Sequence, residues 1–223
     1  MENGKKRIRG VVFDFDGVLA DSEPLHLATY QEVFAALGAT LTRDDYYSNL
    51  LGYTDEDVFR IVGAQHGWNW NGGDIAALIT QKSEIFDRII ASGEVLYPGA
   101  VDCIERLAAV FPVGIASGAL RHEIETVLRG AGLLHHVNFI VSAGDTKESK
   151  PAPDPYLRAA ELHGVAPSEC VAIEDSRWGI ESAKAAGMKC VGITNTYPAS
   201  ELTTADRVIS SLDEFTEALI RSL

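Results

Sequence analysis

Two acids follow a short apolar run near the start of the chain. Residues 11–13 are apolar, and Asp14 and Asp16 come next, with Phe15 between them. An ionised acid at the mouth of a buried strand is costly unless a cation or a reaction uses its charge. The run therefore predicts a site that binds a metal ion and a phosphate group.

The two acids have different predicted roles. A carboxylate can attack a phosphoryl group and form an acyl phosphate, which splits one displacement into two easier ones. We assign this role of nucleophile to Asp14. A second carboxylic acid can protonate the leaving oxygen and then deprotonate water, and we assign this role to Asp16. Strand pleating predicts that both acids face one cavity while Phe15 points away from it.

Polar residues also follow three later apolar runs. In an open parallel sheet, ligands collect at the carboxyl ends of the strands, so polar residues at these positions are expected to lie together. Phosphoryl transfer passes through a highly charged state that needs hydrogen-bond donors and positive charge. Ser117 and Gly118 are therefore expected to bind phosphate, and Lys150 is expected both to bind phosphate and to take part in catalysis.

The acids of the first and fourth runs suit a magnesium ion. Mg²⁺ binds one or two protein carboxylates, keeps several waters and shares the substrate phosphate. Asp14 and Asp175 are the predicted direct ligands, and Asp16 is expected to face the ion with its backbone carbonyl. Glu174 is the fourth predicted metal residue, and the sequence leaves open whether it binds the ion directly or through water.

Apolar runs of strand length alternate with longer amphipathic stretches in the second half of the chain. This pattern is typical of a parallel sheet with crossover helices. The predicted strands are 11–15, 113–117, 139–142, 171–174, 190–193 and 207–209. The predicted helices of this part are 99–109, 122–131, 155–163, 179–186 and 212–222.

The intervening region has helical periodicity and no run suited to the sheet. Its predicted helices are 25–37, 42–50, 55–66 and 75–90. Trp68 and Trp70 lie between the last two and are expected to cover a small core, although a binding surface is the alternative. The predicted domains are a catalytic core of residues 1–23 and 96–223 and a helical cap domain of residues 24–95.

Composition and charge narrow the class of protein. The 223 residues are 46% hydrophobic and 23% charged, which is typical of a soluble globular protein. A net charge of −13 disfavours nucleic acid as a partner. No apolar run is long enough to span a membrane, and residues 1–10 do not resemble a signal peptide. We expect a cytoplasmic protein that is a monomer or a weak homo-oligomer.

The core motifs resemble those of the haloacid dehalogenase superfamily, in the branch that holds phosphoglycolate phosphatase and β-phosphoglucomutase. They are DFDGVLADSEPLH from Asp14, IASGA from Ile115, SKPAPDPY from Ser149 and AIEDSRWGIESAKAAGM from Ala172. The resemblance implies an α/β fold with a doubly wound, Rossmann-like and mainly parallel sheet, and an all-helical cap inserted after the first strand. It also implies Mg²⁺-dependent transfer through an aspartyl-phosphate.

The resemblance also implies substrate contacts in the cap. It places His26 beside the hinge, and Ser22 becomes a hydroxyl of the substrate cleft. Arg88 falls near a basic position of mutase caps. The alternatives are a packing or surface role for His26 and a local turn for Ser22.

The expected activity is hydrolysis of a small phosphorylated metabolite, such as a sugar phosphate or a phosphoglycolate-like acid. Relatives that cleave carbon–halogen bonds lack the second acid, so Asp16 argues against dehalogenation. In the mutase pattern an arginine of the first cap loop grips a distal phosphate, whereas this chain has Asp55 there, which would repel it. A phosphohexomutase is the first alternative, and a non-catalytic protein that binds a phosphometabolite is the second.

Overall fold

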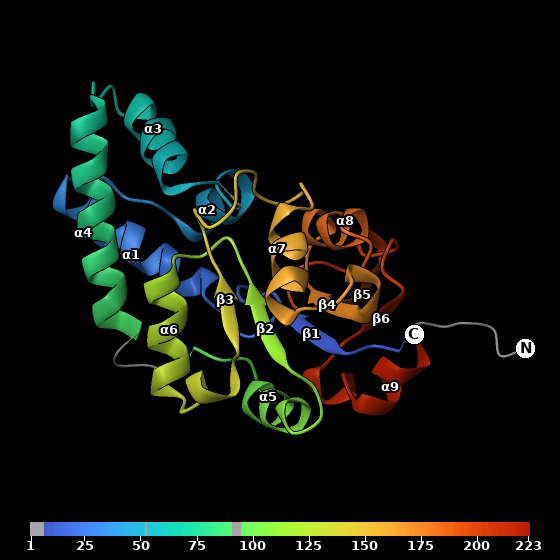
Figure 1. Cartoon of the computed structure of the whole chain (residues 1–223). Coiled ribbons are helices and arrows are strands. Elements are labelled where there is room, and N and C mark those ends of the chain that lie inside the picture. The colour runs from blue at the N-terminus through green and yellow to red at the C-terminus, as the bar shows by residue number, and fades with distance from the viewer. Residues whose placement is uncertain (1–6, 52, 91–94) are drawn as a thin grey trace, which may run out of the picture. The chain divides into compact units, whose positions relative to one another are not determined.

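Parallel strands form a six-stranded sheet in a computed structural model that describes residues 7–51, 53–90 and 95–223 (Figure 1). Their order across the sheet is β3-β2-β1-β4-β5-β6. The strands are β1 (Gly10–Phe13), β2 (Val113–Ala116), β3 (Phe139–Val141), β4 (Cys170–Glu174), β5 (Lys189–Ile193) and β6 (Arg207–Ile209).

Strand β1 lies at the centre of the sheet, where the strand order changes direction. Val12 is in register with Gly114 of β2 on one side and with Ala172 of β4 on the other. The chain leaves β1 toward β2 and β3 and later returns to β4 on its opposite edge. Such a reversal opens a crevice at the carboxyl ends of the two central strands, where ligands of doubly wound folds bind.

Helices cover both faces of the sheet. The α-helices of this part are α5 (Ala100–Ala108), α6 (Arg121–Gly130), α7 (Asp154–His163), α8 (Arg177–Ala185) and α9 (Glu217–Ser222). Helix α7 packs against β1, β2 and β3, and α8 packs against β4 and β5. Figure 1 shows α7 and α8 on one face of the sheet and α5 on the other.

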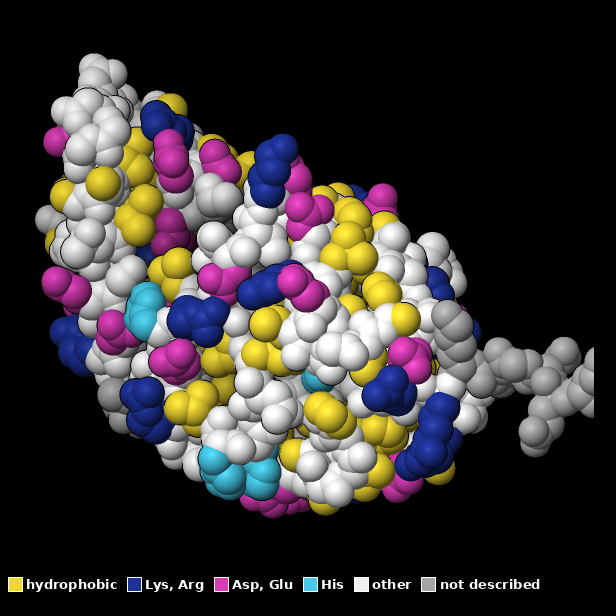
Figure 2. Space-filling model, viewed as in Figure 1, with side chains coloured by type: hydrophobic (Ala, Val, Ile, Leu, Met, Phe, Trp, Pro, Cys, Tyr) yellow, Lys and Arg dark blue, Asp and Glu magenta, His cyan; other side chains and the backbone are white. Residues whose placement is uncertain are grey.

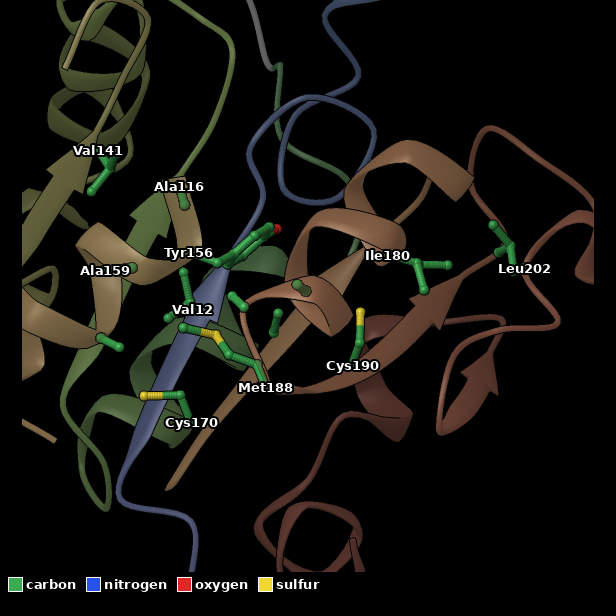
Figure 3. Packing of buried hydrophobic residues seen from close by; sticks show 14 residues of the cluster. Val12, Ala116, Val141, Tyr156, Ala159, Cys170, Ile180, Met188, Cys190 and Leu202 are labelled. Carbon is green, nitrogen blue, oxygen red and sulfur yellow. The ribbon is translucent and has the colours of Figure 1, made fainter. Parts of the chain in front are cut away.

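Side chains that alternate along each strand fill two separate layers. Val12 and Ala172 belong to a buried apolar cluster with residues of α7 and α8. Figure 3 shows Val12 close to Tyr156 in this cluster. Phe13 points to the opposite face and meets Phe215 edge to face, with ring centroids 5.7 Å apart. The cluster on the α7 side consists largely of small side chains, so both helices approach the sheet closely and can carry residues to its carboxyl edge.

The helical region forms a unit of its own. The chain divides into two compact units, one of Met1–Asp21 with Val95–Leu223 and the other of Ser22–Glu94. The second contains α1 (Glu23–Ala36), α2 (Arg43–Asn49), α3 (Asp55–Gln65) and α4 (Gly72–Ile90). Aromatic and aliphatic side chains form its core, where Phe34 and Phe59 are fully buried and the partly buried Trp68 and Trp70 pack against the cluster.

The predicted fold class is confirmed: a doubly wound parallel sheet carries an inserted all-helical unit. The division expected from the sequence, at 23/24 and 95/96, falls close to the limits of the two units. Residues 1–6, Gly52 of the first cap loop and residues 91–94 before the predicted second boundary lie outside the described residues. None of the described helices is long and apolar enough to cross a membrane.

Capping residues account for the limits of two helices that differ from their predicted ranges. Helix α4 begins at Gly72 instead of residue 75, since the Asn71 side chain accepts from the backbone N–H groups of Gly73 and Asp74. The predicted helix 212–222 is wrong as one element: a 3₁₀ turn spans Leu212–Glu214, and Thr216 then caps a new helix, α9.

Candidate active site

The chain makes a tight loop directly after β1. The backbone carbonyl of Phe15 accepts from the N–H groups of Leu19 and Ala20, at 2.9 and 3.0 Å. Gly17 supplies the positive φ of 77° that this loop requires. Asp14 thus stands at the end of the central strand, and Asp16 lies half-buried in the loop.

Lys150 joins the acid of the first motif to an acid of the fourth. Its Nζ lies 2.9 Å from Oδ1 of Asp14 and 2.6 Å from Oε1 of Glu174. Burial alone would lower the pKa of Lys150, but the two carboxylates raise it above its ordinary value, so the side chain is an ammonium. The structure brings Asp14, Lys150 and Glu174 together at one edge of the sheet, as predicted.

Three carboxylates crowd around this lysine. Asp14, Glu174 and Asp175 are all buried, and each offers one oxygen atom to a group whose members lie within 4.8 Å of one another. Burial, followed by repulsion from Glu174, raises the pKa of Asp14 well above its ordinary value, and Lys150 only partly offsets this. Three acids facing one ammonium are short of positive charge, so the group fits a divalent cation.

Asp16 does not belong to this group of carboxylates within the described part of the chain. Its side chain is half-buried, whereas the other three acids are buried. The separation agrees with a division of labour in which Asp16 handles protons while the other acids handle the cation. Its role as acid and base, and the metal contact of its carbonyl, stay predictions.

The loop after β5 supports the site through Asn195 and Thr196, which the sequence did not predict to be part of it. The Asn195 side-chain amide donates to the carbonyl of Gly17 at 2.8 Å. The Thr196 hydroxyl donates to the carboxylate of Asp175. The segments after the second, third and fourth strands are marked in the sequence by a serine–glycine pair, a lysine and two acids. An asparagine and a threonine after the fifth strand are a weaker signal of a functional site.

Ser117 and Gly118 lie where β2 ends, as expected for a phosphate-binding turn. Ser117 is buried, and its Oγ accepts from the backbone N–H of Ala119 at 3.1 Å. Gly118 is exposed, and an added side chain would meet no atom within 4 Å. Helix α6 begins at Arg121, one residue before its predicted start at 122, so the N–H groups nearest to Ser117 belong to the turn that precedes the helix.

The helical unit Ser22–Glu94, called the cap unit below, holds a second buried polar cluster. The Nζ of Lys82, which is only 2% exposed, lies 2.8 Å from Oδ1 of Asp55 and 3.0 Å from Nδ1 of His26. The Tyr30 hydroxyl donates to the same Asp55 oxygen. Burial and the Lys82 charge lower the pKa of His26 to about 3, so the imidazole is neutral at pH 7 and accepts at Nδ1.

This cluster changes the charge argument drawn from Asp55. The sequence suggested a carboxylate that would repel a second phosphate, but within the cap unit Lys82 compensates that charge and the Tyr30 hydroxyl donates a hydrogen bond to it. The presence of Asp55 is therefore weaker evidence against mutase chemistry than the sequence alone indicated. The sequence did not predict a buried role for Lys82, because a lysine in an amphipathic helix is usually exposed.

Two other residues predicted to contact substrate, Arg88 and Ser22, lie outside this cluster. Arg88 is exposed and makes an ion pair with Glu32, its Nη2 lying 2.6 Å from Oε1. Ser22 is buried at the start of α1, where its carbonyl accepts from the N–H groups of Leu25 and His26. The local role of Ser22 at the helix start is thus present, and substrate contacts of Ser22, His26 and Arg88 stay predictions.

A doubly wound sheet with an acid cluster and a bridging lysine at its switch point is suited to phosphoryl chemistry. A family model described as haloacid dehalogenase-like hydrolase matches residues 11–193. The chain belongs to this family.

Named relatives agree with this assignment. The chain is 35% identical over 207 residues to Protein CbbY of Rhodobacter capsulatus, covering 85% of this chain and 87% of that protein. It is 31% identical over 188 residues to the fructose-1-phosphate phosphatase YqaB of Escherichia coli strain K12, covering 84% and 97%. The family match and these relatives together show that the protein is a phosphoric monoester hydrolase.

A solved structure gives the same fold. The crystal structure of a CbbY mutant from Rhodobacter sphaeroides, in complex with xylulose-(1,5)bisphosphate, superposes with a TM-score of 0.84 at 28% sequence identity. The match covers 97% of this chain and 100% of that chain.

Replacement of Gly17 tests the loop after β1. A Cβ at this position would lie 2.0 Å from Oδ2 of Asp175 and 2.7 Å from Oγ1 of Thr196. We expect Gly17→Ala to lower phosphatase activity by about 100-fold, because displaced catalytic groups lose that much with shifts near 1 Å. Gly132→Ala is the matched control: its φ is 73° and no atom lies within 4 Å of the added carbon. Equal activity losses in both variants would contradict this account.

The pH dependence of metal binding tests the crowding of the acids. Burial and the Glu174 charge raise the pKa of Asp175 to about 7. Without metal, this acid holds its proton more tightly in the folded state, so its contribution to stability is present below about pH 4 and lost as pH rises through about 7. Metal binding must displace that proton, so affinity for Mg²⁺ should fall by up to about tenfold per pH unit below 7.

The measurement is the rise in melting temperature caused by Mg²⁺ relative to EDTA, at pH 5.5 and at pH 8. We expect a clearly larger rise at pH 8, and a smaller pH dependence in Asp175→Asn, which has no proton to displace at this position. The same rise at both pH values in the natural protein would show that the acids do not compete with protons for the metal.

Proposed function

We propose that the protein is a Mg²⁺-dependent phosphatase that hydrolyses a small phosphorylated metabolite through an aspartyl-phosphate. The observation that supports this most strongly is the bridge from Lys150 to Asp14 and Glu174, beside Asp175, at the carboxyl end of the central strands. An acid, its neutralising lysine and two further acids come from three separate segments and meet at one point.

The proposed mechanism gives each group one task. Asp14 attacks phosphorus with a carboxylate oxygen, and the bond between phosphorus and the leaving oxygen breaks while Asp16 donates a proton to that oxygen. Asp16 then removes a proton from water, whose oxygen attacks phosphorus and releases Asp14 and inorganic phosphate. Lys150 favours the ionised, nucleophilic form of Asp14, since its ammonium partly offsets the rise in the pKa of that carboxyl group caused by burial and Glu174.

Phosphate oxygens would be bound by groups at the end of β2. The Ser117 hydroxyl and the N–H of Gly118 are the proposed donors, and Lys150 adds positive charge. Asp14, Glu174 and Asp175 would hold Mg²⁺ together with the carbonyl of Asp16. When bound, the ion would neutralise negative charge on the transferring phosphoryl group.

Small phosphorylated sugars are the proposed substrate class. The relative YqaB is named a fructose-1-phosphate phosphatase, and the CbbY structure contains xylulose-(1,5)bisphosphate. Nucleic acid is disfavoured: on the face shown in Figure 2, the described Lys and Arg side chains are dispersed among Asp and Glu. A cytoplasmic location and a monomeric or weakly associating chain stay predictions from the sequence.

A screen of phosphorylated sugars and of phosphoglycolate tests this proposal. We expect inorganic phosphate to be released with Mg²⁺ and release to stop with EDTA. Isomerised sugar phosphate as the main product, with a requirement for a bisphosphate, would instead support the mutase. Thermal stabilisation by a ligand with no release of phosphate would support a binding protein. Unchanged turnover in EDTA would contradict the metal requirement.

A further inference from the structure

Tyr156 is a fully buried tyrosine that the proposed mechanism does not use. It lies in the first turn of α7 and points into the apolar cluster between that helix and the sheet (Figure 3). A buried phenol needs a hydrogen-bond partner, because the hydroxyl would otherwise lose its contacts with water. Its partner is Oε1 of Glu174, at 2.7 Å.

Glu174 reaches this position because of the strand pleat. It lies two residues after Ala172 on β4, so its side chain is on the same face of the sheet as the α7 cluster. It is fully buried, and α8 closes over it at Gly179, where an added Cβ would lie within 2.0 Å of each carboxyl oxygen. The carboxylate is therefore enclosed by two helices.

The two oxygens of Glu174 have unequal contacts. Oε1 accepts from both Tyr156 and Lys150, at 2.7 and 2.6 Å. Among the described residues, Oε2 has one long contact, from the Ser176 hydroxyl at 3.3 Å. One oxygen is thus committed to protein donors, whereas the other retains most of its capacity as an acceptor or a metal ligand.

The ring of Tyr156 also contacts the lysine. The Nζ of Lys150 lies 5.1 Å from the ring centroid, within the range of a cation–π interaction. A single side chain therefore contacts both members of the ion pair between Lys150 and Glu174, while remaining shielded from solvent.

We propose that Tyr156 is a positioning residue of the metal site: its hydroxyl fixes Oε1 of Glu174 beside Lys150 and leaves Oε2 as the oxygen presented to the cation. The inference rests on the proposed function, since it requires that the acid group binds a divalent ion. Residues that orient metal ligands without touching the metal commonly change metal affinity by 10- to 100-fold when replaced.

The test is metal binding by Tyr156→Phe, which removes one oxygen atom and keeps the ring. Binding of Mn²⁺ is followed by the EPR signal of the free ion, a readout that does not depend on turnover. We expect the dissociation constant for Mn²⁺ to rise by about tenfold. The hydroxyl removed acts through Glu174, so Tyr156→Phe should have no further effect on Mn²⁺ binding in a Glu174→Gln background.

Tyr46→Phe is the matched control. Tyr46 is also buried and its hydroxyl donates to a glutamate, Oε2 of Glu23 at 2.7 Å, but both residues belong to the cap unit. Its Mn²⁺ affinity should equal that of the natural protein. Natural affinity in Tyr156→Phe would overturn the inference, as would equal losses with and without Glu174→Gln. Failure of the natural protein to bind Mn²⁺ would overturn the proposed function and this inference with it.

Discussion

Asp14→Asn should abolish phosphate release, with a loss of at least about 1,000-fold in kcat for p-nitrophenyl phosphate, because an amide cannot serve as the nucleophile. The asparagine is nearly the same size, and the hydrogen bond from the N–H of Phe15 to Oδ1 at this position can be kept. The protein should remain folded and should still bind phosphate. The steady release of p-nitrophenol, followed at saturating Mg²⁺, measures the loss.

Asp21→Asn provides the control for this substitution. Asp21 is an exposed acid a few residues further along the same segment, and its contact with the Tyr97 hydroxyl at 3.3 Å is long. We expect activity close to that of the natural protein. An Asp14→Asn enzyme that retains a tenth or more of the natural turnover would rule out Asp14 as the nucleophile.

Lys150→Met should have the second largest effect, on both activity and stability. The substitution keeps much of the side-chain volume but leaves the buried carboxylates of Asp14 and Glu174 without their cation. Loss of one positive donor at a phosphoryl-transfer site costs about 100- to 1,000-fold in kcat. Breaking a buried ion pair costs about 3–5 kcal/mol in the free energy of unfolding.

The pH dependence of this stability loss identifies its cause. The unpaired carboxylates can take up protons at low pH, so the loss should be smaller at pH 5 than at pH 8. Denaturant unfolding of Lys150→Met and of Lys147→Met, whose lysine is exposed in the preceding loop, measures the difference. A loss that does not change with pH would indicate altered packing instead of unpaired charge.

The sequence predicted the sheet well because its strands are short apolar runs with clear breaks. Each strand of the described sheet lies within one or two residues of its predicted range. The helices were also identified, but their ends depend on single hydrogen bonds from side chains such as Asn71 and Thr216. Such capping is weakly encoded next to the stronger signal of periodicity, which is why residues 212–222 were predicted as one helix.

The site was predictable where one rule applied, namely that polar residues after parallel strands share one edge. This rule predicts from the sequence alone that Asp14, Lys150 and Asp175 lie together. It could not find Tyr156, which lies on a helix and reaches the site through the core. A tyrosine among small apolar residues on a buried helix face was the available signal, because its hydroxyl must find a partner.

The cap unit shows a second limit of prediction from sequence, which concerns the charge of a site. Asp55 was interpreted from its sequence position as a negative charge, and the structure pairs it with Lys82 from a helix that begins later in the chain. Charge at a site depends on contacts between residues far apart in sequence, which periodicity and spacing do not predict. The same limit applies to Asn195 and Thr196. These residues follow β5, and they contact Gly17 of the first motif and Asp175 of the fourth.

The most direct test of the account is a crystal structure of the protein with Mg²⁺ and beryllium fluoride, which mimics a phosphoryl group on a carboxylate. We predict beryllium bonded to an oxygen of Asp14, with a magnesium ion held by Asp14 and Asp175 and with Lys150 in contact with the fluoride. Beryllium fluoride bonded to another side chain, or a magnesium ion bound away from these acids, would contradict the central claim that Asp14 is the phosphoryl acceptor of a metal-dependent phosphatase.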